Sequence, residues 1–207
     1  MKCLYIDTSS NYLYTAIVDK DEIINSVSEK YDQSLSEVAL LKISNMFSEV
    51  NCNTKDIEKI IVVNGPGSFT GIRIGVTIAK VYAWGLNIPV TSITSLESMA
   101  VSTNINSYKV PIIDARRGFV FAAIYDEENN EKLKPQHIKL VDLEQKLSTI
   151  SEYKYITNDE LDLNKEKTKF VPNYLNIVNK FITKNNISPH ALNPDYLKLT
   201  EAEESNK

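Results

Sequence analysis

The residues best suited to chemistry are the glycines of the segment GPGSFTGIRIG, which runs from Gly65 to Gly75. The segment follows a continuous apolar run at residues 59–63, which predicts a buried strand, and it precedes the start of a helix. Glycine permits positive φ and close backbone approach, so loops that enter a helix use it to present N–H groups to an anion. Two interpretations remain open, a phosphate-binding loop and a structural turn from strand to helix.

The spacing of these glycines does not match two well-known phosphate-binding motifs. The segment is not a P-loop, because no Gly-Lys-Ser/Thr follows and no lysine could reach the phosphates. It is not the dinucleotide-binding fingerprint either, because Gly71 stands one position too late after Gly65 and Gly67.

Two aspartates, Asp7 and Asp114, stand at predicted hairpin turns. In a nucleotide-dependent phosphotransferase such aspartates could hold a metal or act as a base, whereas the plainer role is an Asx-type bond within the turn. Arg116 and Arg117, beside Asp114, could meet a phosphate or an acidic partner, or could form an exposed turn. The candidate nucleotide or phosphate site comprises Asp7, Thr8, Ser9, Gly65, Gly67 and Ser68.

Other catalytic machinery is missing from the sequence. The two histidines, His137 and His190, form no HExxH or HxxxH pair, and Ser68 does not lie in a GxSxG elbow. Cys3 and Cys52 form no CxxC pair, so we expect reduced thiols. We therefore expect no catalytic residue, no metal site and no cofactor held by this chain alone.

The composition limits the function further. The 207 residues carry a formal net charge of −4, which argues against a stand-alone nucleic-acid binder. No segment approaches the roughly 18 apolar residues of a membrane span, and the first residues lead into a strand-like run without a signal peptide. We expect a cytoplasmic protein without a membrane partner.

A repeated pattern predicts the domain organisation. Residues 110–125, VPIIDARRGFVFAAIY, match residues 3–18, CLYIDTSSNYLYTAIV, at a constant offset of 107 residues, so that Asp114 corresponds to Asp7. Each copy predicts a strand, an aspartate, a tight turn and a second strand. We expect an α/β fold of two lobes from duplicated units, divided in the polar stretch 102–107. The N-terminal lobe then covers residues 1–105, the C-terminal lobe residues 106–200, and residues 201–207 form a frayed tail.

Two helices are predicted in the first lobe. One begins at a capping box formed by Ser34 and Glu37 and extends to Val50. The other extends from Phe69 to Trp84 and carries a strip of small residues, namely Gly71, Gly75, Ala79 and Ala83. Because a glycine in a helix interior costs about 1 kcal/mol relative to alanine, we expect another backbone close to this strip.

That backbone belongs either to the chain's own domain or to a partner subunit. The broad apolar arc of the second helix, with Arg73, Thr77, Lys80 and Trp84 on the far side, favours the partner. The predicted subunit interface then comprises Leu35, Ala39, Ile43, Met46, Ile72, Gly75, Val76, Ala79 and Ala83.

Four segments together resemble a known family. They are IDTSS, NGPGSFTGIRIGVTIAKVYAWGLNIPVTSITSLESMA, IIDARRGFVFAAIY and the late PDYLKLTEAE, and they closely resemble the TsaB (YeaZ) family of bacterial tRNA threonylcarbamoyladenosine synthesis. The match is dense over roughly the first 125 residues and thin afterwards. The chain departs from the family at Gln33, where histidine is common, and at Lys198, where the family has arginine.

The resemblance implies an actin/hexokinase/Hsp70-like (ASKHA) fold and a non-catalytic subunit. It implies pairing with the catalytic paralogue TsaD through the two helices of the N-terminal lobe, association with the ATPase TsaE, and homodimers when the partner is absent. Transfer of the threonylcarbamoyl group to the adenosine next to the anticodon would then be TsaD's, tRNA would be met only through the complex, and a nucleotide could sit at the subunit boundary. The alternative is an ATP-dependent kinase-like enzyme of the same fold that uses Asp7 and the Gly65 loop, whereas a protease lacks its nucleophile and zinc ligands.

Overall fold

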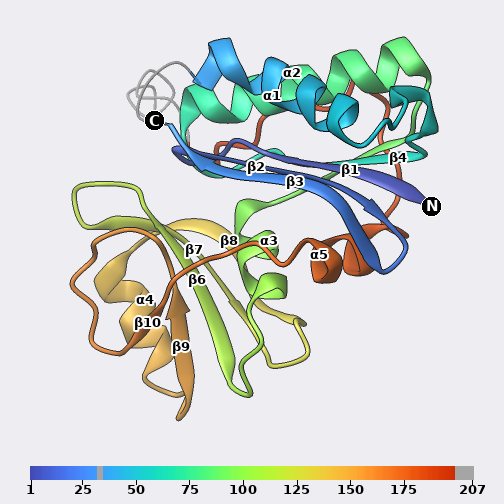
Figure 1. The fold of residues 1–207 in the computed structure, drawn as a ribbon. Coiled ribbons are helices and arrows are strands. Elements are labelled where there is room, and N and C mark those ends of the chain that lie inside the picture. Colours follow the sequence, from blue (N-terminus) through green and yellow to red (C-terminus); the bar gives the residue numbers. More distant parts are fainter. Residues whose placement is uncertain (32–34, 199–207) are drawn as a thin grey trace.

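The computed structural model describes residues 1–31 and 35–198, which form two lobes, each built around a five-stranded mixed sheet (Figure 1). The first sheet has the order β3-β2-β1-β4-β5 and the second the order β10-β9-β6-β7-β8. The first sheet comprises β1 (Lys2–Asp7), β2 (Tyr12–Asp19), β3 (Glu22–Lys30), β4 (Lys59–Val63) and β5 (Val90–Ile93). The second comprises β6 (Tyr108–Asp114), β7 (Phe119–Tyr125), β8 (Glu131–Lys139), β9 (Tyr153–Ile156) and β10 (Lys167–Thr168).

The two sheets share one topology, which confirms the predicted duplication and the ASKHA fold. In each lobe three antiparallel strands form a meander, and its first strand pairs in parallel with the fourth strand of the lobe. The strand order of the second sheet, taken from its other edge, is therefore the same as that of the first.

The constant offset of 107 residues is wrong for β6. Along β7 it holds, since Ala16 and Ala123 both face the core between the lobes. Along β6 the equivalent of Ile6 on the outer face is Ile112, so Asp7 corresponds to Ile113 and not to Asp114. The reason is that the second hairpin is one residue longer between equivalent positions, since Asp7 pairs with Tyr14, seven residues on, whereas Ile113 pairs with Phe121, eight residues on. A slip of one residue moves every side chain of a strand to the opposite face.

The helices form three layers, one outside each sheet and one between the two sheets. Helices α1 (Leu35–Glu49) and α2 (Phe69–Leu86) cover the outer face of the first sheet, and α4 (Leu140–Leu147) packs on the outer core of the second (Figure 1). Helices α3 (Ser95–Ser102) and α5 (Tyr174–Phe181) lie between the sheets, and a single-turn 3₁₀ helix spans Thr54–Asp56. The predicted cap Ser34 and the tail 201–207 lie outside the described residues. In the part of the chain that is described, no helix is long and apolar enough to cross a membrane.

The boundary predicted for the C-terminal lobe is wrong at its far end. After α5 the chain returns to the first lobe, where Ile187 forms a β-bridge with Val90 and Leu192 is fully buried among the residues under α1 and α2. The assignment of residues 106–200 to the second lobe therefore fails for the segment after α5. Sequence periodicity could not show this return, because the segment forms no regular element of its own.

Buried Lys59 of β4 attaches the C-terminal end of α5 to the first lobe. Its Nζ donates to the carbonyl oxygens of Ile182 at 2.7 Å and Lys184 at 2.6 Å. Burial lowers the pKa of Lys59. At the other end of α5, the Tyr174 hydroxyl lies 2.6 Å from Ser28 Oγ and donates to the Val27 carbonyl. These contacts attach both ends of α5 to the first sheet.

Removing the ammonium of Lys59 should destabilise the protein. Lys59→Met keeps an apolar chain in the strand but leaves two part-buried carbonyls without a donor, so we expect a loss of about 1–3 kcal/mol in the free energy of unfolding. Lys55→Met, at an exposed position of the 3₁₀ helix, is the matched control and should change it by less than about 0.5 kcal/mol. Urea denaturation of the three proteins measures the difference, and equal losses would contradict the role of Lys59.

Candidate functional site

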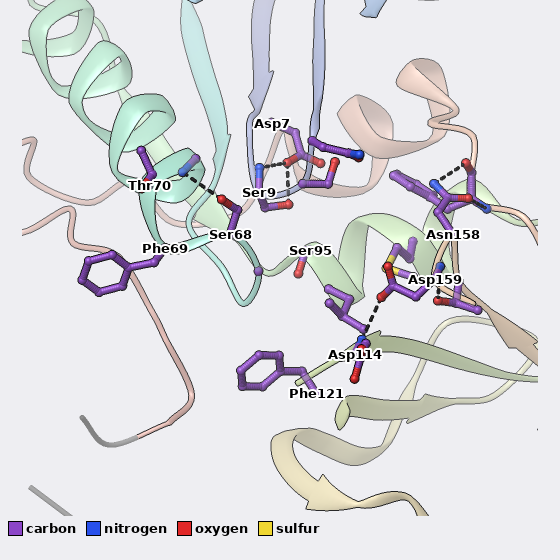
Figure 2. A pocket seen from close by; sticks show the side chains of 18 of the residues that line it. Asp7, Ser9, Ser68, Phe69, Thr70, Ser95, Asp114, Phe121, Asn158 and Asp159 are labelled. Atoms are coloured by element: carbon purple, nitrogen blue, oxygen red, sulfur yellow. Dashed lines mark hydrogen bonds between the residues drawn. The ribbon is translucent and has the colours of Figure 1, made fainter. Parts of the chain in front are cut away.

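A cleft of about 840 Å³ lies between the two lobes. Figure 2 shows Asp7, Ser9 and Ser68 on one side of it and Asp114 and Asp159 on the other. Its size is that of a small-molecule site. Whether its polar groups are available to a ligand depends on the bonds that they already make.

Asp7 is committed to its own turn. Its Oδ1 accepts hydrogen bonds from the Ser9 backbone N–H at 2.8 Å and from Ser9 Oγ at 2.7 Å. Its Oδ2 accepts from the Tyr5 hydroxyl at 3.2 Å, and that hydroxyl also lies 2.9 Å from Ser98 Oγ. Burial raises the pKa of Asp7, although the bonds from Ser9 and Tyr5 oppose the shift. The Asx-type bond within the turn is thus the role that the geometry supports.

The glycine loop packs against the same turn. The Ser68 N–H donates to the Ser9 carbonyl at 2.7 Å, and a Cβ on Gly67, which has φ +151°, would lie 2.1 Å from that oxygen. Ser68 Oγ accepts from the Gly71 N–H at 3.2 Å and caps α2. Of the predicted site, Asp7, Ser9, Gly67 and Ser68 line the cleft together, whereas Thr8 is fully buried against α2 and Gly65 packs against Asp195. The polar groups of Asp7, Ser9 and Ser68 bond to one another or to the start of α2, which favours the structural turn over the phosphate-binding loop.

The small-residue strip of α2 faces the chain's own hairpin. A Cβ on Gly71 would lie 2.0 Å from the Thr8 carbonyl oxygen, and one on Gly75 would lie 2.3 Å from Thr8 Oγ1. Thr8 is fully buried, and its hydroxyl donates to the Gly71 carbonyl at 2.7 Å. The close backbone expected from the strip is thus the Asp7–Ser9 turn, and no second polypeptide is needed to explain the glycines.

The predicted interface residues must be corrected for the same reason. Eight of the nine are buried inside the first lobe, and Leu35 is half-buried against the same core. Those eight are Ala39, Ile43, Met46, Ile72, Gly75, Val76, Ala79 and Ala83. The apolar arc of α2 is wide because the sheet, α1 and the returning segment around Leu192 all pack on it. These side chains cannot meet a partner without opening the core.

Large apolar side chains instead stand on the outward faces of α1 and α2. Their exposed fractions are 53% for Leu40, 58% for Leu41, 51% for Phe69, 61% for Val81 and 70% for Trp84. We call these five residues the outward face. The interface prediction missed them, although the sequence held a signal, a tryptophan on the arc of α2 that also carries Arg73, Thr77 and Lys80.

The remaining candidates do not converge on a reactive centre. The Asp114 side chain is exposed and accepts from the Arg116 N–H at 2.8 Å within its own turn. Arg116 and Arg117 both have positive φ, as expected of an exposed turn. The His137 ring stacks on the Phe119 ring, with centroids 4.7 Å apart. Burial raises the pKa of the Cys3 thiol to about 12, so this thiol stays protonated. Among the residues that the structure describes, no three His, Cys, Asp or Glu side chains could jointly hold a metal.

Two glycines of α2 provide a matched test of the contact with the turn. Gly75→Ala should lower the free energy of unfolding by about 1–3 kcal/mol, because its Cβ has no room beside Thr8. Gly85→Ala should raise it by up to about 1 kcal/mol, because nothing lies within 4 Å of its Cβ and alanine favours the helix. Thermal or urea unfolding checks both, and a stabilising Gly75→Ala would contradict the assigned contact.

The raised pKa of Asp7 predicts the sign of a pH effect. The folded state favours the protonated carboxyl, so the stability that this group contributes is present at low pH and is lost as pH rises from the ordinary aspartate pKa through the raised value. The side chain of Asp7→Asn cannot ionise. Between about pH 3 and about pH 7, we therefore expect the free energy of unfolding of the wild type to fall relative to that of Asp7→Asn. Urea denaturation across that range measures the gap.

A second variant separates ionisation from hydrogen bonding at this position. Asp7→Ala should be less stable than Asp7→Asn at every pH by about 1–3 kcal/mol, because the Ser9 donors lose their acceptor. Parallel pH curves for the wild type and Asp7→Asn would show that the buried carboxyl does not titrate as described.

Comparison with known proteins gives the chain relatives along its whole length. A family model described as "TsaD: tRNA N6-adenosine threonylcarbamoyltransferase" matches residues 23–203. The Bacillus subtilis tRNA threonylcarbamoyladenosine biosynthesis protein TsaB is 32% identical over 98% of this chain and 96% of its own. The Escherichia coli protein of the same name is 30% identical over 63% of this chain and 57% of its own.

A solved structure supports the fold independently of close sequence identity. YeaZ from Pseudomonas aeruginosa superimposes with a TM-score of 0.76, covering 95% of this chain and 99% of its own at 17% identity. Together with the duplicated topology and the GPGSFTGIRIG turn, these relatives show that the chain belongs to the TsaB (YeaZ) family of tRNA threonylcarbamoyladenosine biosynthesis proteins.

Proposed function

We propose that the chain is a non-catalytic subunit that binds and activates the catalytic paralogue TsaD in threonylcarbamoyl transfer to the adenosine next to the tRNA anticodon. The observation that carries this proposal is the outward face, where five large apolar side chains from two adjacent helices are each more than half exposed. Clusters of this kind mark sites of protein association, and tryptophan is enriched among the residues that dominate binding energy.

The match to the TsaD family model supports a paralogue as the partner. This chain matches that model over residues 23–203, which supports a common fold for the two proteins and pairing through corresponding helices. In this proposal the outward faces of α1 and α2 meet TsaD, and the same surface forms homodimers when TsaD is absent. TsaE and tRNA join through the complex, and any nucleotide that binds does so at the subunit boundary and not on this chain alone.

The bonding in the cleft supports a non-catalytic role. A kinase-like enzyme would need Asp7 free for a metal or a substrate, whereas this carboxyl is buried and accepts three hydrogen bonds from Ser9 and Tyr5. It would also need loop N–H groups aimed at a phosphate, whereas the Ser68 N–H donates to Ser9. Both features argue against the kinase-like alternative.

Truncating Trp84 tests the proposal. Trp84→Ala should weaken binding to purified TsaD by about 10- to 100-fold, the effect expected of a central interface residue. Its thermal unfolding should be nearly unchanged, because the side chain is 70% exposed. Val141→Ala, at a 66%-exposed position on α4 of the other lobe, is the control and should bind as the wild type does.

Isothermal titration calorimetry of each variant against TsaD gives the dissociation constants. Equal affinity of Trp84→Ala and the wild type would contradict pairing through the outward face. Reconstituted modification of tRNA adds a second readout, since it should fall with the affinity of the pair, and modification by this chain without TsaD would refute the non-catalytic role.

A further inference from the structure

The returning segment, residues 192–196, packs across the beginning of α2 and is hydrogen-bonded there. The backbone N–H of Asp195 donates to the Asn64 carbonyl at 2.7 Å, and Asn64 Nδ2 donates to the Asn193 carbonyl at 3.1 Å. Leu192 is fully buried in the core below. A Cβ on Gly65 would lie 1.9 Å from the Asp195 carbonyl oxygen, so the glycine loop leaves room for this segment. The next residue, Tyr196, is thereby held beside the first turn of α2.

Tyr196, Phe69 and Arg73 form a stacked cluster at this point. The rings of Tyr196 and Phe69 are stacked with centroids 4.8 Å apart. The Arg73 Cζ lies 3.7 Å from the centroid of the Phe69 ring, and Arg73 Nε donates to the Tyr196 hydroxyl at 2.7 Å. A guanidinium that stacks on an aromatic ring and donates one hydrogen bond has lost most of its rotational freedom before any partner arrives.

The guanidinium nevertheless retains binding capacity. Arg73 is exposed and forms no ion pair within residues 1–31 and 35–198. Its Nε is used, which leaves the terminal N–H groups for a planar anion such as a carboxylate. Its position one turn after Phe69 makes it continuous with the outward face, which also includes Trp84 on the same helix.

The charge of this helix indicates the partner's chemistry. The side chains of α2 include two cations, Arg73 and Lys80, and no carboxylate, although the whole chain has a net charge of −4. A second copy packed α2 against α2 would oppose like charges, so a homodimer through this surface should be weaker than the pair with TsaD. A different protein with a carboxylate at the edge of an apolar surface is complementary in both respects.

We infer that Arg73 is the ion-pair anchor of the outward face, at which a carboxylate of the catalytic paralogue binds beside Phe69, and that Tyr196 is a positioning residue that orients the guanidinium. This inference rests on the function proposed above. It adds an electrostatic contact at one end of a surface that is otherwise apolar. It also explains why the returning segment packs against the start of α2, because this packing places Tyr196 beside Arg73.

The test is the affinity for purified TsaD at two salt concentrations. Arg73→Gln should weaken binding by about tenfold or more at about 50 mM salt, and by less at about 300 mM, because screening already weakens the wild-type ion pair there. Arg73→Lys should recover only part of the loss, since it keeps the charge but not the planar fork. Tyr196→Phe keeps the ring stack but removes the hydrogen bond to Arg73, so a smaller loss of about threefold is expected.

Controls separate this inference from the proposed function and from misfolding. Lys134→Gln, at an exposed position on β8, removes one positive charge elsewhere and should bind as the wild type does. Each variant should unfold within a few degrees of the wild type. If an Arg73 variant is destabilised by more than that, the loss of affinity in Tyr196→Phe still tests the inference. If Trp84→Ala weakens binding and Arg73→Gln does not, or if the salt dependence of Arg73→Gln equals that of the wild type, the anchor is refuted while the proposed function stands. If neither variant weakens binding, the proposed function itself fails.

Discussion

The contact between the Asp7–Ser9 turn and the first turns of α2 determines the arrangement of the whole first lobe. Backbone and side-chain oxygens of Thr8 and Ser9 occupy the space where Gly67, Gly71 and Gly75 would otherwise carry a Cβ. Because the turn lies so close, α2 is seated on the sheet along its small-residue strip. The opposite arc of the helix, which carries Phe69 and Trp84, must then point outward.

The same contact engages the polar groups of Asp7, Ser9 and Ser68, which line the cleft. Asp7 orients Ser9, Ser9 accepts the N–H of Ser68, and Ser68 caps α2, so each polar group is engaged by the next. In this chain the motif that looks most like a phosphate site acts as a structural joint. The exposed apolar residues that α2 contributes to the outward face lie on the far side of this helix. The glycine motif keeps them exposed because it fixes the orientation of the helix.

The sequence was sufficient to predict much of the fold. Alternation and turn residues predicted both hairpins, the duplication predicted two sheets of equal topology, and the glycine spacing predicted a close backbone at α2. Periodicity could not identify whose backbone that was, because a helix face packed on its own sheet and one packed on a partner have the same apolar pattern. A constant offset could not reveal that the second hairpin is one residue longer, so that Ile113, and not Asp114, takes the position equivalent to Asp7. The contact of Tyr196 with Arg73 joins residues 123 apart and has no local signal.

Pairing of the outward face of α1 and α2 with the catalytic paralogue is tested most directly by hydroxyl-radical footprinting of this chain with and without TsaD. We expect oxidation of Phe69 and of Trp84, the single tryptophan of the chain, to fall sharply in the complex. Exposed apolar residues elsewhere, Ile23 on β3 and Val141 on α4, should react equally in both states. Unchanged oxidation of Trp84, with protection appearing on the second lobe instead, would contradict pairing through the outward face.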